Sequence, residues 1–414
     1  MLDRTLPPPF HEADVFDTPA PQQIQAGQLD VYWLQQVDQP AVRIELVWPA
    51  GRWYEPKPGV SHFLATLLDK GTRKHSALEI AEHLEYHGSS IEAESGYDYL
   101  TVTLLSIQSQ VSKVLPLLFE ILTDCTFPTE ELRLARNIYL QNLQVNRQKN
   151  SFLASVAMRE NLFGKNHPYG SRLEEPEVDA ISVESLTEYY QQLGRPKIFI
   201  TGKVSEQVIQ ELSGFFSVHQ SYIKETPLFN PVQGERRLRI ERAESIQTAL
   251  RLAKLTINRQ DPEYACVVLA NHILGGYFGS RLMRNIREEK GLTYGIYSSI
   301  NPFAHASIHF IAADVNKENR ELATSEIIKE LKMLQSLEEE ELTTARNHFL
   351  GSLQLEVANP FSIMDRFKTT VLMGLPQKFY ETLARDIKGL ELQHLKQVAI
   401  LHFDASHFDE VSVG

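Results

Sequence analysis

The feature that most constrains the fold is an internal repeat. The segment Glu130–Gln144 reads EELRLARNIYLQNLQ, and Glu340–Gln354 reads EELTTARNHFLGSLQ. Nine of these fifteen positions are identical, and the segments lie 210 residues apart, half of the chain. Two unrelated amphipathic helices would share leucine spacing, but they would not also share the Ala-Arg-Asn triplet. The sequence therefore predicts two copies of one unit of about 200 residues.

A chain of 414 residues is too long for one ordinary core, so two domains are expected. We place an N-terminal domain at residues 1–213, a linker at 214–235 and a C-terminal domain at 236–414. The linker lacks hydrophobic periodicity and holds several turn-forming residues, namely Pro227, Asn230, Pro231 and Gly234.

Both halves are expected to run through the same order of elements. In the first half, strands are expected at 29–35, 42–49, 90–94, 99–107 and 197–202, and helices at 61–68, 77–86, 111–123, 130–148 and 183–192. In the second half, strands are expected at 238–241, 248–257, 293–300 and 307–315, and helices at 263–274, 281–289, 318–335, 339–356 and 360–373. Strands follow one another through hairpins and helices come in runs, which predicts an α+β fold. Each of the two tandem homologous domains is then a mostly antiparallel sheet with helices packed on one face.

Composition excludes several classes of protein. The formal net charge of −12 does not favour binding to a nucleic acid. No apolar run approaches the roughly 18 residues that span a bilayer, so no membrane segment is expected. The N-terminus lacks a basic stretch followed by an apolar one, which predicts a cytoplasmic protein; a periplasmic location stays open if a signal was removed. Cys125 and Cys266 have apolar neighbours, which favours small buried side chains over a disulfide.

The segment Gly59–Thr72, GVSHFLATLLDKGT, carries an incomplete metal motif. Zinc peptidases with the inverted motif H-x-x-E-H place two histidines on one helical face, with the glutamate as general base. His62 fills the first position, but Ala65 stands in place of the glutamate and Thr66 in place of the second histidine. Alanine cannot accept a proton and one imidazole cannot hold zinc, so this helix is expected to bind no metal.

The residues that frame this motif resemble the pitrilysin/insulinase family of zinc metallopeptidases, in which H-F-L-E-H is followed by K-G-T. Gly59 stands before the helix and Lys70-Gly71-Thr72 after it. The resemblance implies a third zinc ligand, a glutamate, at the position of Asn142, and a helper glutamate at Ala135. Every zinc position after His62 is therefore replaced, and we expect no cofactor in this chain.

A second histidine pair offers an alternative metal site. His83 and His87 are also four residues apart, but Glu85 lies on another face of the helix. The helix is expected to end near Gly88, where a histidine suits the helix dipole. This position favours a helix-end pair over a relocated metal site, although an active metallopeptidase with such a site stays an alternative.

The second half contains LGGYFGSRLMRNIREEKGLTYGIYSSI, from Leu274 to Ile300. This segment resembles the family's pattern R-E-x-x-G-L-x-Y, in which Arg287 and Tyr294 match the conserved pair. The resemblance implies that the pair binds the scissile carbonyl and stabilises the oxyanion, acting in trans on a partner's site. The alternatives are a helix-end cation for Arg287 and an ordinary strand aromatic for Tyr294.

Two further segments are candidates for substrate binding. Gly275 and Gly276, with Phe278 beside them, would let a peptide backbone approach closely, although a tight turn without a ligand stays open. In the first half, Glu92 and Ala93 match the family's edge strand, which adds a peptide as an extra strand. Glu92 replaces the usual asparagine, which leaves the role of that side chain open.

The resemblance implies a non-catalytic subunit of a heterodimeric zinc metallopeptidase, similar to the silent subunits of bacterial heterodimers and of mitochondrial processing peptidase. The expected partner is a homologous subunit that carries H-x-x-E-H and the zinc, and the expected ligands are peptides. A homodimer is also possible. The main alternative is a catalytically silent scaffold of a larger complex, and no hydrolysis is expected from the chain alone.

Overall fold

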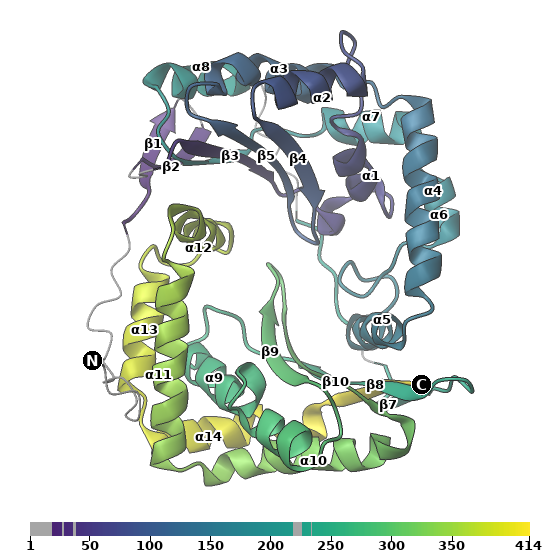
Figure 1. Ribbon diagram of the computed structural model, residues 1–414, viewed down its shortest axis with the longest axis vertical. Helices are drawn as coiled ribbons and strands as arrows, with labels where there is room; N and C mark the ends of the chain where they lie inside the picture. Colours follow the sequence, from purple (N-terminus) through teal and green to yellow (C-terminus); the bar gives the residue numbers. More distant parts are fainter. Residues whose placement is uncertain (1–18, 27–28, 36–38, 218–225, 233) are drawn as a thin grey trace, which may run out of the picture.

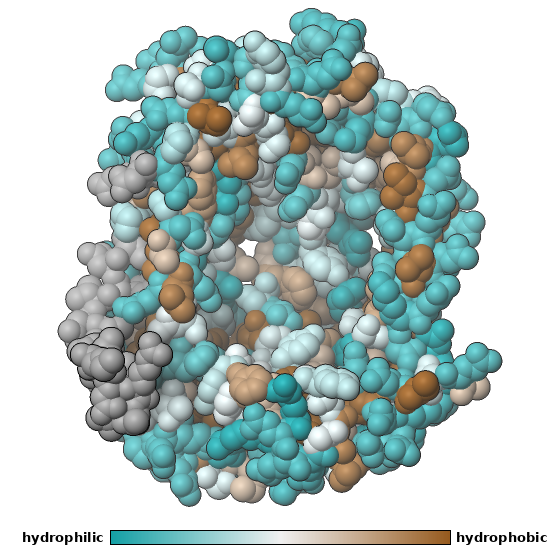
Figure 2. All heavy atoms as spheres, viewed as in Figure 1, coloured by the Kyte–Doolittle hydropathy of each residue, from teal (hydrophilic) through white to brown (hydrophobic). Residues whose placement is uncertain are grey.

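The computed structural model describes residues 19–26, 29–35, 39–217, 226–232 and 234–414. Two halves, each built on one sheet, face each other across a central hollow (Figures 1 and 2). The strands of the first sheet are β1 (Gln22–Ala26), β2 (Leu29–Leu34), β3 (Ala41–Trp48), β4 (Ser90–Ser95), β5 (Leu100–Ile107) and β6 (Lys197–Thr201). Those of the second sheet are β7 (Arg237–Ile240), β8 (Gln247–Leu255), β9 (Ile296–Pro302), β10 (Ser307–Asn316) and β11 (Asp409–Val413).

The two sheets have the same topology. The first has the order β1-β2-β6-β3-β5-β4 and the second the order β7-β11-β8-β10-β9, so the five strands after β1 correspond one to one. Each sheet contains one parallel pair at the same place, β2 with β6 and β7 with β11, and its other pairs are antiparallel. The expected α+β fold with two tandem homologous domains is confirmed.

Helices fill the connections in both halves. Those of the first half are α1 (Val60–Leu67), α2 (Ala77–Tyr86), α3 (Val111–Asp124), α4 (Thr129–Asn146), α5 (Asn150–Phe163), α6 (Glu175–Asp179), α7 (Val183–Gln191) and α8 (Glu206–Ser217). Those of the second half are α9 (Tyr264–Asn271), α10 (Arg320–Met333), α11 (Glu339–Glu356), α12 (Pro360–Leu372), α13 (Phe379–Gly389) and α14 (Leu392–His402). Two π-helices, η2 (His272–Gly276) and η3 (Met283–Glu289), follow α9.

The repeated segment forms α4 in one half and α11 in the other, and its identical residues make equivalent contacts. Three of the four shared apolar residues are buried in both helices: Leu132, Ala135 and Leu143 in α4, and Leu342, Ala345 and Leu353 in α11. The shared arginine also has the same role, since Arg136 donates to Ile181 O and Arg346 donates to Leu390 O. The residues that are identical in the two copies are therefore mainly those that pack the helix on its own domain.

The first sheet is covered on its second face by α12, a helix of the other half (Figure 1). Side chains alternate between the faces of a strand. Along β3, Ile44 and Leu46 belong to the core beneath the helices of the first half, whereas Val47 contacts the opposite cluster. That cluster consists of Tyr32, Leu34, Val47, Phe199 and Met364 of α12.

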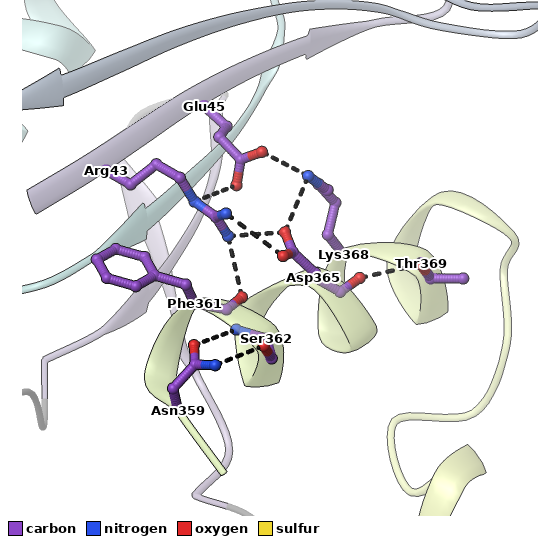
Figure 3. Close-up of polar contacts among 8 residues, drawn as sticks. All are labelled: Arg43, Glu45, Asn359, Phe361, Ser362, Asp365, Lys368 and Thr369. Carbon is purple, nitrogen blue, oxygen red and sulfur yellow. Dashed lines mark hydrogen bonds and ion pairs between the residues drawn. The ribbon is translucent and has the colours of Figure 1, made fainter. Parts of the chain in front are cut away.

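Ion pairs fix the position of α12 on this sheet (Figure 3). Arg43 Nη2 donates to Asp365 Oδ1 at 2.7 Å and to Phe361 O at 3.0 Å. Lys368 donates to Glu45, whose side chain is only 5% exposed. A carboxylate this deeply buried is costly unless it is paired, so Glu45 favours the register that brings Lys368 beside it.

The second sheet is covered in the same way by α5 of the first half. Ala249 and Ala253 of β8 point to α5, and their small size lets the helix approach closely. Arg251, from the same face of the strand, donates from Nε to Ser155 Oγ at 3.2 Å. Because α5 and α12 follow α4 and α11 respectively, each half covers the sheet of the other with the same element of the repeat.

The two long hairpins also meet between the halves. His305 of the β9–β10 turn stacks on Trp53 of the first half with ring centroids 4.1 Å apart. Asp98 of the β4–β5 turn accepts from Tyr169 Oη at 2.6 Å and from Ala304 N at 3.0 Å. These contacts join the halves at a third point, besides α5 and α12.

Some expectations need correction. The linker expected from Gly214 begins later, because α8 continues to Ser217 with its apolar residues still on one face. Seven α-helices and strands of the described chain are not expected from the sequence, namely β1, α5, α6, α8, α13, α14 and β11.

Two other features relate to the expectations from composition. Cys125 and Cys266 are free, and burial raises the pKa of each thiol to about 12. Among the described residues, no helix is both long and apolar enough to cross a bilayer.

The contact between α12 and the first sheet can be tested by truncating one side chain. Met364 is fully buried there, so we expect Met364→Ala to lower the free energy of unfolding by about 2–5 kcal/mol. Met333, which is 45% exposed, provides the matched control, and Met333→Ala should change stability by less than about 0.5 kcal/mol. Chemical denaturation followed by circular dichroism measures both, and equally small changes would contradict the packing of α12 on this sheet.

Candidate functional site

The helix that carries His62 has a well-defined start. Gly59 precedes it with a φ of +89°, a conformation that favours glycine. Glu55 accepts from Gly59 N at 2.9 Å and from Ser61 N at 3.2 Å, so one carboxylate satisfies two backbone donors at the start of α1. The family's helix geometry is therefore present even though its metal motif is not.

His62 lies among aromatic side chains rather than metal ligands. Its ring is 5.2 Å from that of Tyr139 on α4 and 5.2 Å from that of Phe63. Burial lowers the pKa of His62, and Arg52 acts in the same direction, so the imidazole is neutral at neutral pH. The residue acts as a packing element between α1 and α4.

The other zinc positions offer no substitute ligands. Ala65 is buried, and Thr66 Oγ1 donates to His62 O at 2.9 Å within the helix. Asn142 is exposed on α4, and Ala135 is buried in the same helix. The part of the chain that the structure describes contains no group of three or more His, Cys, Asp or Glu side chains placed to hold a metal. These residues do not fit the zinc that the resemblance implies.

The alternative histidine pair does not form a ligand cluster either. The rings of His83 and His87 are 4.9 Å apart at the end of α2. His87 Nδ1 lies 3.0 Å from Gln110 Oε1, which accounts for one of its ring nitrogens. Gly88 follows with a φ of +57°, as expected for a residue that ends a helix.

Arg287 occupies an unusual backbone segment, the π-helix η3. A π-helix adds a residue to a turn and often occurs at functional positions. Within the described residues, no carboxylate lies within 4.0 Å of Arg287, although Arg281 just before η3 and Arg284 within it both pair with Glu341. Instead, the guanidinium of Arg287 lies 4.7 Å from the ring centroid of Phe278.

The glycine-rich turn presents this aromatic ring. A Cβ at Gly275 would lie 2.7 Å from Ser298 N, so only glycine lets the turn pack against β9. A Cβ at Gly276 would lie 2.7 Å from His272 Nδ1. Phe278 follows with 62% of its surface exposed, and Arg287 above its ring is half-buried. The turn therefore has a packing function, and it also presents an aromatic ring at the surface beside Arg287.

Tyr294 is 94% exposed and lies in the turn before β9, so its interpretation as a strand aromatic is wrong. The turn is ordered by Thr293, whose hydroxyl donates to Asp314 O at 2.7 Å. Among the described contacts, none joins Tyr294 to Arg287. In this chain Tyr294 points to solvent, whereas the half-buried Arg287 packs on Phe278.

The candidate strand of the first half, β4, lies at the edge of its sheet. Glu92 and Ala93 pair with Thr103 and Val102 of β5 on one side only. Glu92 is exposed, and Ala93 is half-buried. An edge strand leaves backbone groups free for a further strand, which is the geometry that strand addition requires.

Family models match most of the chain. One described as insulinase (peptidase family M16) matches residues 31–177, and one described as peptidase M16 inactive domain matches residues 180–349. The chain belongs to the M16 family. Within it, this member has lost the residues that hold zinc in the first domain.

Similar proteins come from several bacteria. An uncharacterized zinc protease YmxG of Bacillus subtilis is 24% identical over 82% of this chain and 85% of its own. A Helicobacter pylori protein named non-peptidase homolog YmxG is 24% identical over 83% of this chain and 82% of its own. Among solved structures, a peptidase M16 inactive domain from Pseudomonas fluorescens has a TM-score of 0.85 and 25% identity, covering 95% of this chain and 97% of that one.

The structure also reveals a polar group that the sequence analysis missed. His272 Nε2 lies 3.0 Å from His348 Nδ1, and Phe349 contacts His272 edge-on. The repeat offered a signal for this group. His272 lies 210 residues after His62, and Phe349 lies 210 residues after Tyr139. Both halves therefore place a histidine against the aromatic residue of the repeated helix.

The exposure of Tyr294 predicts that its hydroxyl serves no structural purpose in this chain. Tyr294→Phe should leave the midpoint of chemical unfolding unchanged. Tyr169→Phe should lower stability by about 1–3 kcal/mol, because it removes a buried hydrogen bond to Asp98. Chemical denaturation of the two variants beside the unmodified chain makes the comparison. A loss of stability in Tyr294→Phe would show that its hydroxyl is a structural contact.

Proposed function

We propose that this protein is the non-catalytic subunit of a heterodimeric zinc metallopeptidase, which supplies Arg287 and Tyr294 to peptides bound at a partner's zinc site. The observation that carries the proposal is the contrast between the two halves. The described residues of the first half hold no cluster of metal ligands, whereas the second half presents a half-buried arginine on a π-helix and an exposed tyrosine in the turn that follows it.

The first half supports the absence of hydrolysis by the chain alone. A zinc peptidase needs three protein ligands and a general base. Ala65, Thr66 and Asn142 can supply neither the second and third ligands nor the base. The name of the Helicobacter pylori relative, non-peptidase homolog, agrees with this proposal. Zinc is accordingly assigned to the partner, and none to this chain.

The second half supports a role in binding. Arg287 keeps its positive charge at all physiological pH values and holds several donors in a fixed plane. With no described carboxylate to neutralise it, the guanidinium is available to an oxyanion or a carbonyl oxygen. Tyr294 adds a phenolic donor that is almost fully exposed. Preorganised donors of this kind lower the barrier of acyl transfer by stabilising developing negative charge.

Peptide binding has further support from backbone geometry. The edge of β4 at Glu92 and Ala93 offers unpaired backbone groups to an extended chain. In the other half, Phe278, which follows Gly275 and Gly276, contacts the half-buried Arg287. The hollow between the halves, visible in Figure 2, gives a peptide access to the space between the two sheets. The proposed partner is a homologous subunit with an intact H-x-x-E-H motif, and the proposed location is the cytoplasm.

Reconstitution tests the proposal. We expect the purified chain to hydrolyse no peptide, and hydrolysis to appear when the homologous subunit with H-x-x-E-H is added. Arg287→Ala or Tyr294→Phe in this chain should lower kcat of the mixture by roughly a hundredfold, because each change removes one donor to the oxyanion. Activity is measured by cleavage of a fluorogenic peptide library, with zinc content determined for each subunit.

The matched control is Tyr86→Phe, another exposed tyrosine, which lies on α2 of the first half. This variant should keep the full activity of the mixture. Complexes that form but retain full activity in Arg287→Ala and Tyr294→Phe would assign the chain to a scaffold instead. Chelator-sensitive hydrolysis by the pure chain would contradict the proposed loss of the metal site.

A further inference from the structure

A cavity of about 720 Å³ opens in the second half between α9, α11, α12 and α13. One end of it reaches Gly276 of the glycine-rich turn and Ile300 of β9. Its walls are mixed: Val268, Phe349, Phe379 and Leu383 are apolar, whereas other lining residues carry charges or hydroxyls. A ligand that fits must therefore combine an apolar body with a polar or charged group.

Two arginines of this cavity surround one tyrosine. The guanidinium of Arg366 lies 4.4 Å from the ring centroid of Tyr380, and Arg259 Nη1 donates to the hydroxyl of the same residue at 2.9 Å. Burial lowers the pKa of Arg366, and the positive charge of Arg259 acts in the same direction. Two like charges thus share a partly buried position, an arrangement that an anion between them would stabilise.

The described residues neutralise these charges only in part. Arg366 pairs with Glu356, whose side chain is 58% exposed. Arg259 has no carboxylate within 4.0 Å among the described side chains, and its Nε is buried without a hydrogen-bond partner. Asp365 also lines the cavity, but it is engaged by Arg43 at 2.7 Å and by Lys368 at 3.3 Å.

The buried histidine of the cavity adds no charge to it. Burial, with a contribution from His348, lowers the pKa of His272 to about 4, so that imidazole is neutral at neutral pH. Arg259 keeps no paired carboxylate among the described side chains, and it holds an unsatisfied buried donor close to Tyr380. A carboxylate is the anion that a guanidinium binds with matched geometry through two parallel hydrogen bonds.

We propose that this cavity binds the C-terminal residue of a peptide, with its carboxylate on Arg259 and Arg366 and its apolar side chain against Phe349 and Phe379. The inference rests on the proposed function only in that peptides enter the space between the halves. A peptide fits better than a small free acid because the cavity continues to Gly276 and Ile300, where the rest of an extended chain can lie.

Binding to the full chain, without the partner subunit, tests this inference. The probe is a hexapeptide ending in leucine, labelled with fluorescein at its N-terminus, used both as the free acid and as the C-terminal amide. Fluorescence anisotropy should give a dissociation constant at least about tenfold lower for the free acid, because charge-assisted hydrogen bonds form only with the carboxylate. Arg259→Gln should abolish the difference between the two peptides.

Two more variants strengthen the test. Arg385→Gln is the matched control, since Arg385 belongs to α13 but is 75% exposed and does not line the cavity. It should keep the preference for the free acid. Glu356→Gln should bind the free acid several-fold more tightly than the unmodified chain, because it removes the carboxylate that competes for Arg366. This gain keeps the test decisive even if Arg259→Gln fails to fold.

The outcomes separate this inference from the proposed function. Equal binding of acid and amide overturns the carboxylate site but leaves peptide binding intact. Absence of binding by both peptides overturns the inference together with the peptide-binding part of the proposed function. Competition by N-acetyl-leucine at the affinity of the peptide itself would show that the ligand is a small free acid, which also overturns the peptide assignment.

Discussion

The exchange of one helix between the halves is the constraint on which the rest of the structure depends. A sheet has two faces, and a domain that covers only one leaves the other in water. Here α12 covers the open face of the first sheet and α5 that of the second, so each half completes the core of the other. Apolar contacts such as that of Met364 supply the free energy, whereas buried charges such as Glu45 favour one register. The halves are therefore expected to fold and unfold as one unit.

This arrangement also determines where binding residues can lie. Because α12 and α5 cover only part of the inner face of each sheet, the accessible elements are the strands that face the hollow, the sheet edges, the turns that lead into them and the cavities beside the exchanged helices. Tyr294 and the glycine-rich turn adjoin the edge strand β9, and the arginine-lined cavity is closed on one side by α12. Asp365 links the two roles of that helix, since it pairs with Arg43 of the first sheet and also lines the cavity. Binding in the cavity and the contact between the halves therefore share one helix.

The repeat made the fold predictable, because nine identical positions require the same packing twice and fix the order of elements around it. What the sequence did not reveal depends on tertiary contacts. The segment of α5, NSFLASVAMRENLF, is buried nearly all round, so it lacks the one-sided periodicity that identifies a surface helix. The π-helix at Arg287 adds a residue to a turn, which no pattern of apolar positions records. Arg259 and Arg366 are 107 residues apart in the chain and come together only because the turn before α9 and the helix α12 border the same cavity.

The two halves carry different side chains at matching places against the repeated helix. His62 with Tyr139 and His272 with Phe349 occupy matching places against the repeated helix, and Asn142 corresponds to Ser352 in the same way. In the first half this place holds no ionised side chain that could hold a metal, and the histidine only packs. In the second half the matching place opens into a cavity that holds two arginines and a buried unsatisfied donor. A duplicated fold needs its helices and sheets in both copies, but it needs each kind of site only once. The fold and the proposed binding surface of the second half are therefore physically independent of a metal in the first half.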